Sequence, residues 1–341
     1  MSFIREPRRA QQPFLVLQSS VAQSSLGILR QLLEDSSSHS LLFCLLHPSL
    51  LSVNASRVEA FDLLDNVPGY NDNYEEPRHL ILSAVKTAPD ETLDFVIDSV
   101  DTLASDIGSI PQTYEFLCEL VSLVRSRPNP SRLVLHILSP SPLLPLLCQT
   151  RFSPSLTHTI SHPPALLRHL ATEYLTLPPP LSPEAKFWGI FLPVSERMHE
   201  SERLIFGSEG EGAGDDDEML IEVIVRGDGG DGLRRRCVDR TLQGWSLTRG
   251  LGPLPDMVSL RPLFSRTVAE PSAADPTQNV SFNLNLTASQ QKSRAQVPLP
   301  YMHEGDPGKP QKNPVASAAI FYDPDSADDL DDDDPDEDLD I

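Results

Sequence analysis

Short apolar runs alternate with helix-like patterns from residue 13 to about residue 245. A run of four to eight apolar residues bounded by turn residues predicts a strand, and apolar residues spaced by three or four predict a helix. The predicted strands are residues 14–17, 41–46, 80–84, 93–97, 133–138, 156–160, 187–192 and 219–225, and the predicted helices are residues 25–33, 113–125, 143–149 and 164–173. Strands that are apolar throughout, with helices between them, indicate a mainly parallel sheet covered on both faces, and therefore a three-layer α/β domain. From residue 156 onward fewer helices intervene, so antiparallel strands are expected at one edge.

Polar and proline-rich segments interrupt and follow this domain. Residues 207–217 and 227–232 are rich in glycine and acidic residues, which predicts a long exposed hairpin loop and a turn. Ten prolines between residues 253 and 314 exclude long helices and favour an extended chain. The predicted organisation is a basic N-terminal segment (1–12), the α/β domain (13–245), a proline-rich arm (246–320) and a disordered acidic tail (321–341).

The turn after the first predicted strand has the layout of a phosphate-binding loop but not its residues. Strand, eight-residue turn and helix is the arrangement of G-x-x-x-x-G-K-[ST], in which glycines let backbone amides surround the phosphate and lysine neutralises its charge. Gln18 and Gln23 stand at the two glycine positions and Ser24 at the lysine position, so only Ser25 fits. We interpret this segment as a nucleotide-binding architecture that lacks the residues for phosphate binding, and we expect no cofactor.

Asp98 follows the apolar run 93–97, where such folds place an acid that holds a magnesium-bound water. An acidic residue at the end of a core strand is also an ordinary structural feature. Because no lysine accompanies it, the structural interpretation is favoured over the catalytic one.

Neither the histidines nor the cysteines follow the spacing of a metal site. Prolines separate His158 and His162 from His169, and the chain contains no C-x-x-C. The four cysteines lie far apart, mostly within apolar runs, which favours buried thiols over disulfides. We expect no metal and no catalytic residues.

Charge and hydropathy limit where in the cell the chain is expected and whether it contacts a membrane. Of the formal net charge of −22, residues 323–341 supply eleven aspartates and one glutamate without any lysine or arginine, so the remainder is only mildly acidic at −10. No stretch near the N-terminus is apolar enough for a signal peptide, and the longest apolar run, 41–46, is far shorter than the ~20 residues that span a bilayer. These features predict an intracellular protein without a membrane partner.

A second basic cluster contains Arg234, Arg235, Arg236 and Arg240, directly after the glycine-rich turn. A positive strand edge could contact a nucleic-acid phosphate backbone, which is bound through charge and shape. Solvated charge beside the acids of a neighbouring subunit explains the cluster equally well.

Residues 281–287 alternate polar and apolar side chains, as a half-buried strand does. The prolines that follow keep this segment out of a sheet interior, so it needs another chain to cover it. The predicted docking residues are Phe282, Leu284, Leu286, Leu299 and Tyr301.

This segment and the tail resemble the Elongator complex protein 5 family in its fungal form. The matching residues are Phe282-Asn283-Leu284-Asn285-Leu286-Thr287 with Gln290 and Arg294, Leu299-Pro300-Tyr301, Ile320-Phe321-Tyr322-Asp323-Pro324-Asp325, and the acidic run that ends at Ile341. The resemblance implies a RecA-like fold without Walker motifs. It also implies a protein of the cytoplasm and nucleus. It also implies a heterohexameric ring with Elongator complex proteins 4 and 6. That ring binds tRNA and docks on the catalytic Elongator subcomplex, which modifies the wobble uridine. The expected role is a non-catalytic subunit of this complex.

Two other functions stay open at this point. One is a nucleotide hydrolase with an atypical phosphate loop and Asp98 on magnesium. The other is an acidic-tailed chaperone, in which residues 323–341 attract basic partners.

Overall fold

The computed structural model describes residues 12–36, 38–48, 51, 57–70, 74–208, 210, 217–227 and 238–265. The chain divides into two units, Met1–Ala269 and Glu270–Ile341. All helices and strands given below belong to the first unit. Residues 1–11, the predicted docking residues between Phe282 and Tyr301, and the acidic tail lie outside the described residues.

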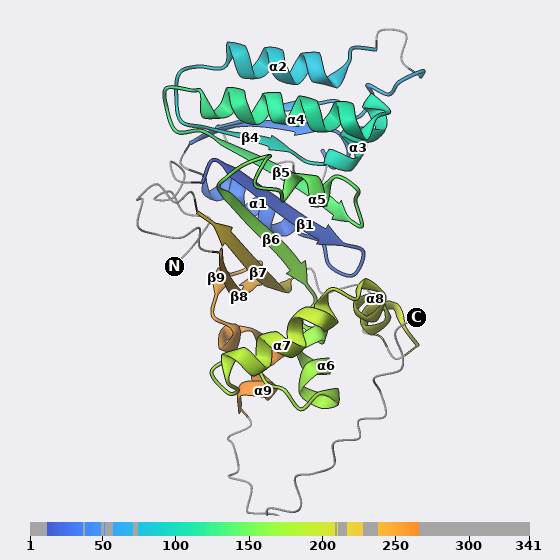
Figure 1. Ribbon diagram of the computed structural model, residues 1–341, viewed down its shortest axis with the longest axis vertical. Helices are drawn as coiled ribbons and strands as arrows, with labels where there is room; N and C mark the ends of the chain where they lie inside the picture. The colour runs from blue at the N-terminus through green and yellow to red at the C-terminus, as the bar shows by residue number, and fades with distance from the viewer. Residues whose placement is uncertain are drawn as a thin grey trace, which may run out of the picture. The chain divides into compact units, whose positions relative to one another are not determined.

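The described residues form a nine-stranded sheet in the order β3-β2-β4-β5-β1-β6-β7-β8-β9 (Figure 1). Its parallel strands are β1 (Phe14–Ser20), β2 (His39–Cys44), β3 (Val58–Asp62), β4 (Leu93–Ile97), β5 (Arg132–Ser139) and β6 (Leu156–His162). Antiparallel pairing then adds β7 (Glu218–Arg226), β8 (Val238–Ser246) and β9 (Gly250–Gly252). The prediction of an α/β domain with a mainly parallel sheet is confirmed. The antiparallel edge also exists, although it begins at β7, because β6 still pairs parallel with β1.

Successive residues of β1 face two different hydrophobic cores, as expected for a strand covered on both sides. Phe14 and Val16 pack in the core that also receives side chains from α2 (Pro77–Thr87), α3 (Val100–Ile107), α4 (Ile110–Arg125) and α5 (Leu144–Leu147). Leu15 and Leu17 pack against α1 (Leu26–Asp35) on the opposite face. A third core joins Leu220 of β7 to α6 (Ala165–Glu173) and α7 (Glu184–Ser195). Figure 1 shows α2, α3 and α4 grouped over the β4 end of the sheet.

Two predicted strands are wrong. Residues 80–84 lie within α2, and residues 187–192 lie within α7. Both segments are short apolar runs, which periodicity alone does not separate from buried helix. The buried residues show the helical spacing: Ile81 and Val85 in α2, and Phe187 and Phe191 in α7. Sequence analysis also does not predict α3, α8 (Met198–Phe206) and β3. The segment 207–217 joins α8 to β7, a helix to a strand, so the prediction of a hairpin loop there is wrong.

Residues 246–265 do not belong to an extended arm, as the sequence predicts, but to the folded unit. They form the end of β8, β9, two 3-10 helices (Leu254–Asp256 and Val258–Leu260) and α9 (Arg261–Ser265). Leu254, Met257, Leu260 and Leu263 are buried in the third core. The prolines there do not prevent this, because Pro255 and Pro262 lie in the first turns of their helices, where no intrahelical N–H is required.

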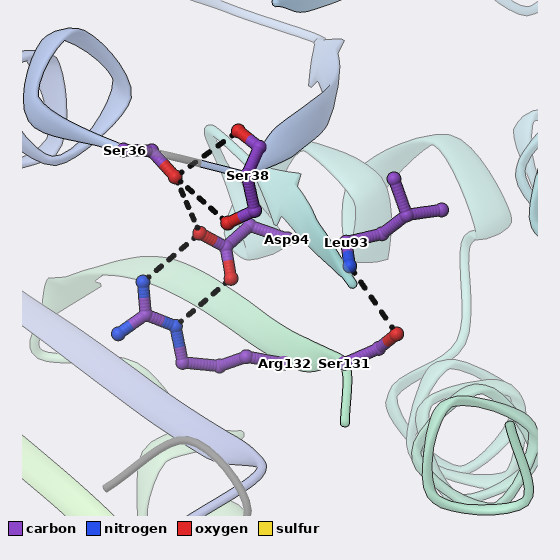
Figure 2. A network of polar contacts seen from close by, with 6 residues as sticks. All are labelled: Ser36, Ser38, Leu93, Asp94, Ser131 and Arg132. Atoms are coloured by element: carbon purple, nitrogen blue, oxygen red, sulfur yellow. Dashed lines mark hydrogen bonds and ion pairs between the residues drawn. The ribbon is translucent and has the colours of Figure 1, made fainter. Parts of the chain in front are cut away.

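A buried ion pair joins the amino-terminal ends of β4 and β5 (Figure 2). Arg132 donates from Nε to Asp94 Oδ1 over 3.2 Å and from Nη2 to Asp94 Oδ2 over 3.1 Å. Ser36 Oγ, at the end of α1, donates to the same carboxylate over 3.3 Å. The Arg132 side chain is 6% exposed and that of Asp94 is 0% exposed, so each is a buried counter-charge of the other.

No helix of the described residues is long and apolar enough to cross a bilayer.

Candidate functional site

The carboxyl ends of β1, β4 and β5 bring the predicted nucleotide-site residues to one edge of the sheet. β5 lies between β1 and β4, so the turn after β1 and the acid after β4 are separated by a single strand. Ser24 and Ser25 precede α1, and Asp98 follows β4 directly. This is the edge where open α/β sheets bind ligands.

Four backbone amides in and beside the turn after β1 have acceptors within this segment. Ser20 N–H donates to Gln23 O over 2.9 Å, and Gln23 N–H donates to Ser20 O over 3.2 Å. Ser25 N–H donates to Ser19 Oγ over 2.8 Å, and Leu26 N–H donates to Ser24 Oγ over 3.2 Å. A phosphate-binding loop leaves such amides directed at its ligand. Here those donors hold the turn closed on itself.

Further contacts bury part of this segment. Ala22 is 1% exposed and packs with Ala165 of α6 and Ile205 of α8. Gln18, at the first glycine position of the phosphate-loop pattern, is part of β1, and its Oε1 lies 2.9 Å from His158 Nε2. Gln23, at the second glycine position, is 2% exposed. Gln18 therefore takes part in an internal hydrogen bond, and Gln23 takes part in internal packing.

A chain of buried hydrogen bonds crosses from β1 to β4 through β5. Ser19 Oγ lies 2.7 Å from Ser25 Oγ and 2.7 Å from His136 Nε2, and His136 Nδ1 lies 2.6 Å from the carbonyl oxygen of Asp98. Because a carbonyl accepts, Nδ1 carries the proton, and Nε2 of the neutral ring accepts from Ser19. Burial lowers the pKa of His136, which is consistent with the neutral ring.

This serine and histidine are not an accessible nucleophile and base. Ser19 is 3% exposed and His136 is 4% exposed. The second ring nitrogen of His136 meets a backbone carbonyl, whereas a catalytic triad places a carboxylate there. The arrangement fixes the relative positions of three strand ends.

Asp98 binds the backbone that follows β2. Its Oδ1 accepts from Leu45 N–H over 2.6 Å, and its Oδ2 accepts from Leu46 N–H over 3.0 Å and from His47 N–H over 2.6 Å. The residue is 0% exposed. Both carboxylate oxygens are thus engaged with main-chain donors, at the place where a metal-binding acid would leave one toward solvent.

The three histidines considered for a metal site lie in separate surroundings. His158 contacts Gln18, whereas His162 Nε2 lies 3.0 Å from Glu222 Oε2. His169 packs its ring edge-on against Tyr174. Within the described part of the chain, no group of three His, Cys, Asp or Glu residues is arranged to hold a metal ion.

Arg240 is the one member of the second basic cluster that the structure describes. Its Nη1 lies 3.0 Å from Glu222 Oε1, and its side chain is 33% exposed. Part of its charge is therefore balanced by a buried carboxylate, which reduces what it can offer to a phosphate. Arg234, Arg235 and Arg236 lie outside the described residues.

Acidification should destabilise the protein through His158. Burial lowers the pKa of this imidazole from 6.5 to about 4. Between those two values the unfolded chain binds a proton that the folded chain does not, so the free energy of unfolding falls as the pH falls, by about 1.4 kcal/mol per pH unit. Urea unfolding at pH 7, 6, 5 and 4.5 measures this slope.

The variant His158→Gln should flatten the slope, leaving the contribution of His136, whose pKa is also lowered. His199→Gln, at an exposed position, is the matched control and should keep the wild-type slope. An unchanged slope in His158→Gln would show that His158 is not a source of the acid sensitivity.

Sequence reasoning missed Ser19 and His136. The available signal was a lone histidine inside the apolar run 133–138, because a buried imidazole needs a hydrogen-bond partner. The sequence does not identify that partner, since Ser19 lies 117 residues away from His136.

The family model described as Elongator subunit Iki1 matches residues 7–323. Elongator complex protein 5 from Mus musculus is 41% identical over 70 residues, which cover 20% of this chain and 23% of the mouse protein. The human protein of the same name is 40% identical over 70 residues, with the same coverage. These alignments therefore span less than a quarter of the relatives that they match.

Among solved structures, a KaiC-like protein from Pyrococcus horikoshii OT3 is similar with a TM-score of 0.36 and 12% identity, over 71% of this chain and 88% of that one. The RadB recombinase is similar with a TM-score of 0.36 and 11% identity, over 72% of this chain and 92% of that one. At this level of similarity, nothing follows about activity or partners.

Proposed function

The chain belongs to the Elongator subunit Iki1 family, and from that premise we propose that it is a non-catalytic subunit of the Elongator complex. In this role it supports modification of the wobble uridine of tRNA, in the cytoplasm and nucleus. Its contribution is assembly: the α/β domain forms a RecA-like ring with Elongator complex proteins 4 and 6, and the ring binds tRNA beside the catalytic subcomplex.

The observation that carries the non-catalytic role is the engagement of Asp98. An acid that positions magnesium needs an oxygen directed at the ligand, but both oxygens of Asp98 accept backbone hydrogen bonds. The turn after β1 supports the same proposal, because four amides in and beside it are bonded internally. With Ser24 at the lysine position, the turn after β1 does not carry the lysine that neutralises phosphate in the P-loop pattern.

Assembly is proposed to depend on the extended segment 279–301. Its apolar residues Phe282, Leu284 and Leu286 alternate with polar ones, which suits an extended chain that lies along a neighbouring subunit. Arg234, Arg235 and Arg236, with a smaller part for Arg240, are proposed as tRNA contacts. The smaller part reflects the ion pair of Arg240 with Glu222.

Deleting residues 279–341 should release the chain from the other Elongator subunits, because the extended segment would no longer bury its apolar side chains on a partner. Stable interfaces bury on the order of 1,200–2,000 Å², and an arm of this length could supply a good part of that area. Affinity purification with quantitative mass spectrometry measures the retained subunits.

Deletion of residues 323–341 alone is the matched control, since it removes the acidic tail and keeps the arm. The shorter deletion should leave co-purification intact. Equal recovery of the other subunits by the longer deletion would refute the role of the arm. Absence of Elongator subunits from the purification of the unaltered chain would refute the proposed function itself.

A further inference from the structure

β3 is an edge strand, and one side of its backbone faces away from the sheet. It pairs with β2 only. Ser40 N–H donates to Arg57 O, and Leu63 N–H donates to Cys44 O. Hydrogen-bonding groups alternate sides along a strand, so the odd-numbered residues bond to β2. The N–H and C=O groups of Val58, Ala60 and Asp62 therefore point outward, and in the described part of the chain no other strand pairs with them.

This edge lacks several devices that proteins use to prevent strand addition. Edge strands are commonly protected by short length, proline, charged side chains (above all lysine), a bulge or an overlying helix. β3 contains neither proline nor lysine, and it pairs with β2 in regular register over all five residues. Glu59, Ala60 and Asp62 are exposed. The strand at the opposite edge, β9, is only three residues long and offers much less backbone.

The surroundings of this edge specify the chemistry of what could bind there. Residues 59–70 contain three acids and no lysine or arginine. The loop that follows β3 exposes Leu64 by 45%, Val67 by 40% and Tyr70 by 92%. Carboxylates repel a phosphate backbone but attract lysine and arginine. Exposed aliphatic and aromatic side chains favour apolar contacts, so a protein segment fits this edge better than a nucleic acid does.

We propose that the β3 edge receives an extended segment of a neighbouring protein subunit as an additional strand. The segment alternates apolar and polar side chains and carries lysine or arginine at its flanks. Main-chain hydrogen bonds to Val58, Ala60 and Asp62 supply affinity, and the acids next to them select the basic flanks. This inference rests on the proposed function, because it assumes that the chain is part of an assembly.

Ala60→Pro in the full-length chain tests the inference. The Ala60 N–H points outward, so proline there removes a donor for the added strand while it leaves the bonds to β2 in place. We expect recovery of at least one Elongator subunit to fall by tenfold or more, with the thermal unfolding midpoint unchanged. Ala60→Val, which keeps the N–H and suits a strand, is the matched control and should assemble as the unaltered chain does.

Wild-type recovery by Ala60→Pro would overturn the inference and leave the proposed function standing. If neither variant nor the unaltered chain recovers Elongator subunits, it is the proposed function that fails.

A photo-crosslinking side chain at position 60 keeps the inference falsifiable even if Ala60→Pro does not fold. In the assembled complex, the adduct should map to an extended, alternately apolar segment of another subunit. The same side chain at Glu119, which is exposed on α4, should not give this adduct. An adduct with RNA or with residues 279–301 of the same chain would overturn the inference, as would the absence of any adduct specific to position 60.

Discussion

Arg132→Met should lower the free energy of unfolding by about 3–5 kcal/mol, because it leaves the Asp94 carboxylate buried without its counter-charge. Asp94 is 0% exposed, and the guanidinium of Arg132 donates to both of its oxygens. Methionine fills a similar volume, so the loss reports the charge pair and not a cavity. Urea denaturation at pH 7, followed by circular dichroism, measures the change.

Two further variants separate charge from geometry at this site. Arg132→Lys keeps the charge but not the paired donors, and an intermediate loss is expected. The double variant Asp94→Leu/Arg132→Met removes both charges and should recover much of the stability lost by the single variant, since apolar replacements of buried ion pairs are often neutral. A single-variant loss below about 1 kcal/mol would contradict this account.

The parts of the fold that sequence predicted well are those where one signal decides the outcome. β1, β4 and β5 are mainly apolar runs because both of their faces are buried, and no helical spacing competes. α2 and α7 also contain apolar runs, and their buried residues are four apart, but an apolar run of five or six residues does not distinguish this spacing from a buried strand. The sequence does not predict the folded residues after 245, because proline favours an extended chain and the first turn of a short helix alike.

The candidate site was predictable as a location but not as an arrangement. Chain order predicts that Gln18–Ser25 and Asp98 lie at one edge of a parallel sheet, and the structure places them there. The partners of Asp98 could not be predicted, because Leu45, Leu46 and His47 lie 51–53 residues earlier and offer only backbone groups. Backbone donors leave no mark on the amino-acid sequence, so a structural acid and a magnesium-binding acid look alike in it.

Asp98→Asn is the substitution that separates these two roles most sharply. The asparagine amide group has one oxygen and one nitrogen, so at least one backbone N–H near it would face another donor. Hydrogen bonds to a charged acceptor contribute about 1.5–3 kcal/mol each, and an unsatisfied buried donor costs a further 1–3 kcal/mol. We expect the free energy of unfolding to fall by about 3–5 kcal/mol, measured by urea denaturation.

The matched control for this prediction is Asp101→Asn, three residues later on α3. The Asp101 carboxylate accepts one backbone bond, from Leu138 N–H over 2.8 Å, at a partly exposed position. Its replacement should cost less than about 1 kcal/mol, because an amide oxygen still accepts a single donor and water reaches the other atom.

Asp98→Asn also tests the rival role, that of a nucleotide hydrolase with an atypical phosphate loop. An acid that holds magnesium is dispensable for folding, so that role predicts an Asp98→Asn chain of normal stability and impaired magnesium-dependent ATP binding by calorimetry. The structural role predicts the reverse: a destabilised variant, and no saturable binding by the unaltered chain at millimolar ATP. Normal stability of Asp98→Asn together with ATP binding by the unaltered chain would refute the non-catalytic proposal. The three backbone hydrogen bonds would then not explain the role of the acid at this position.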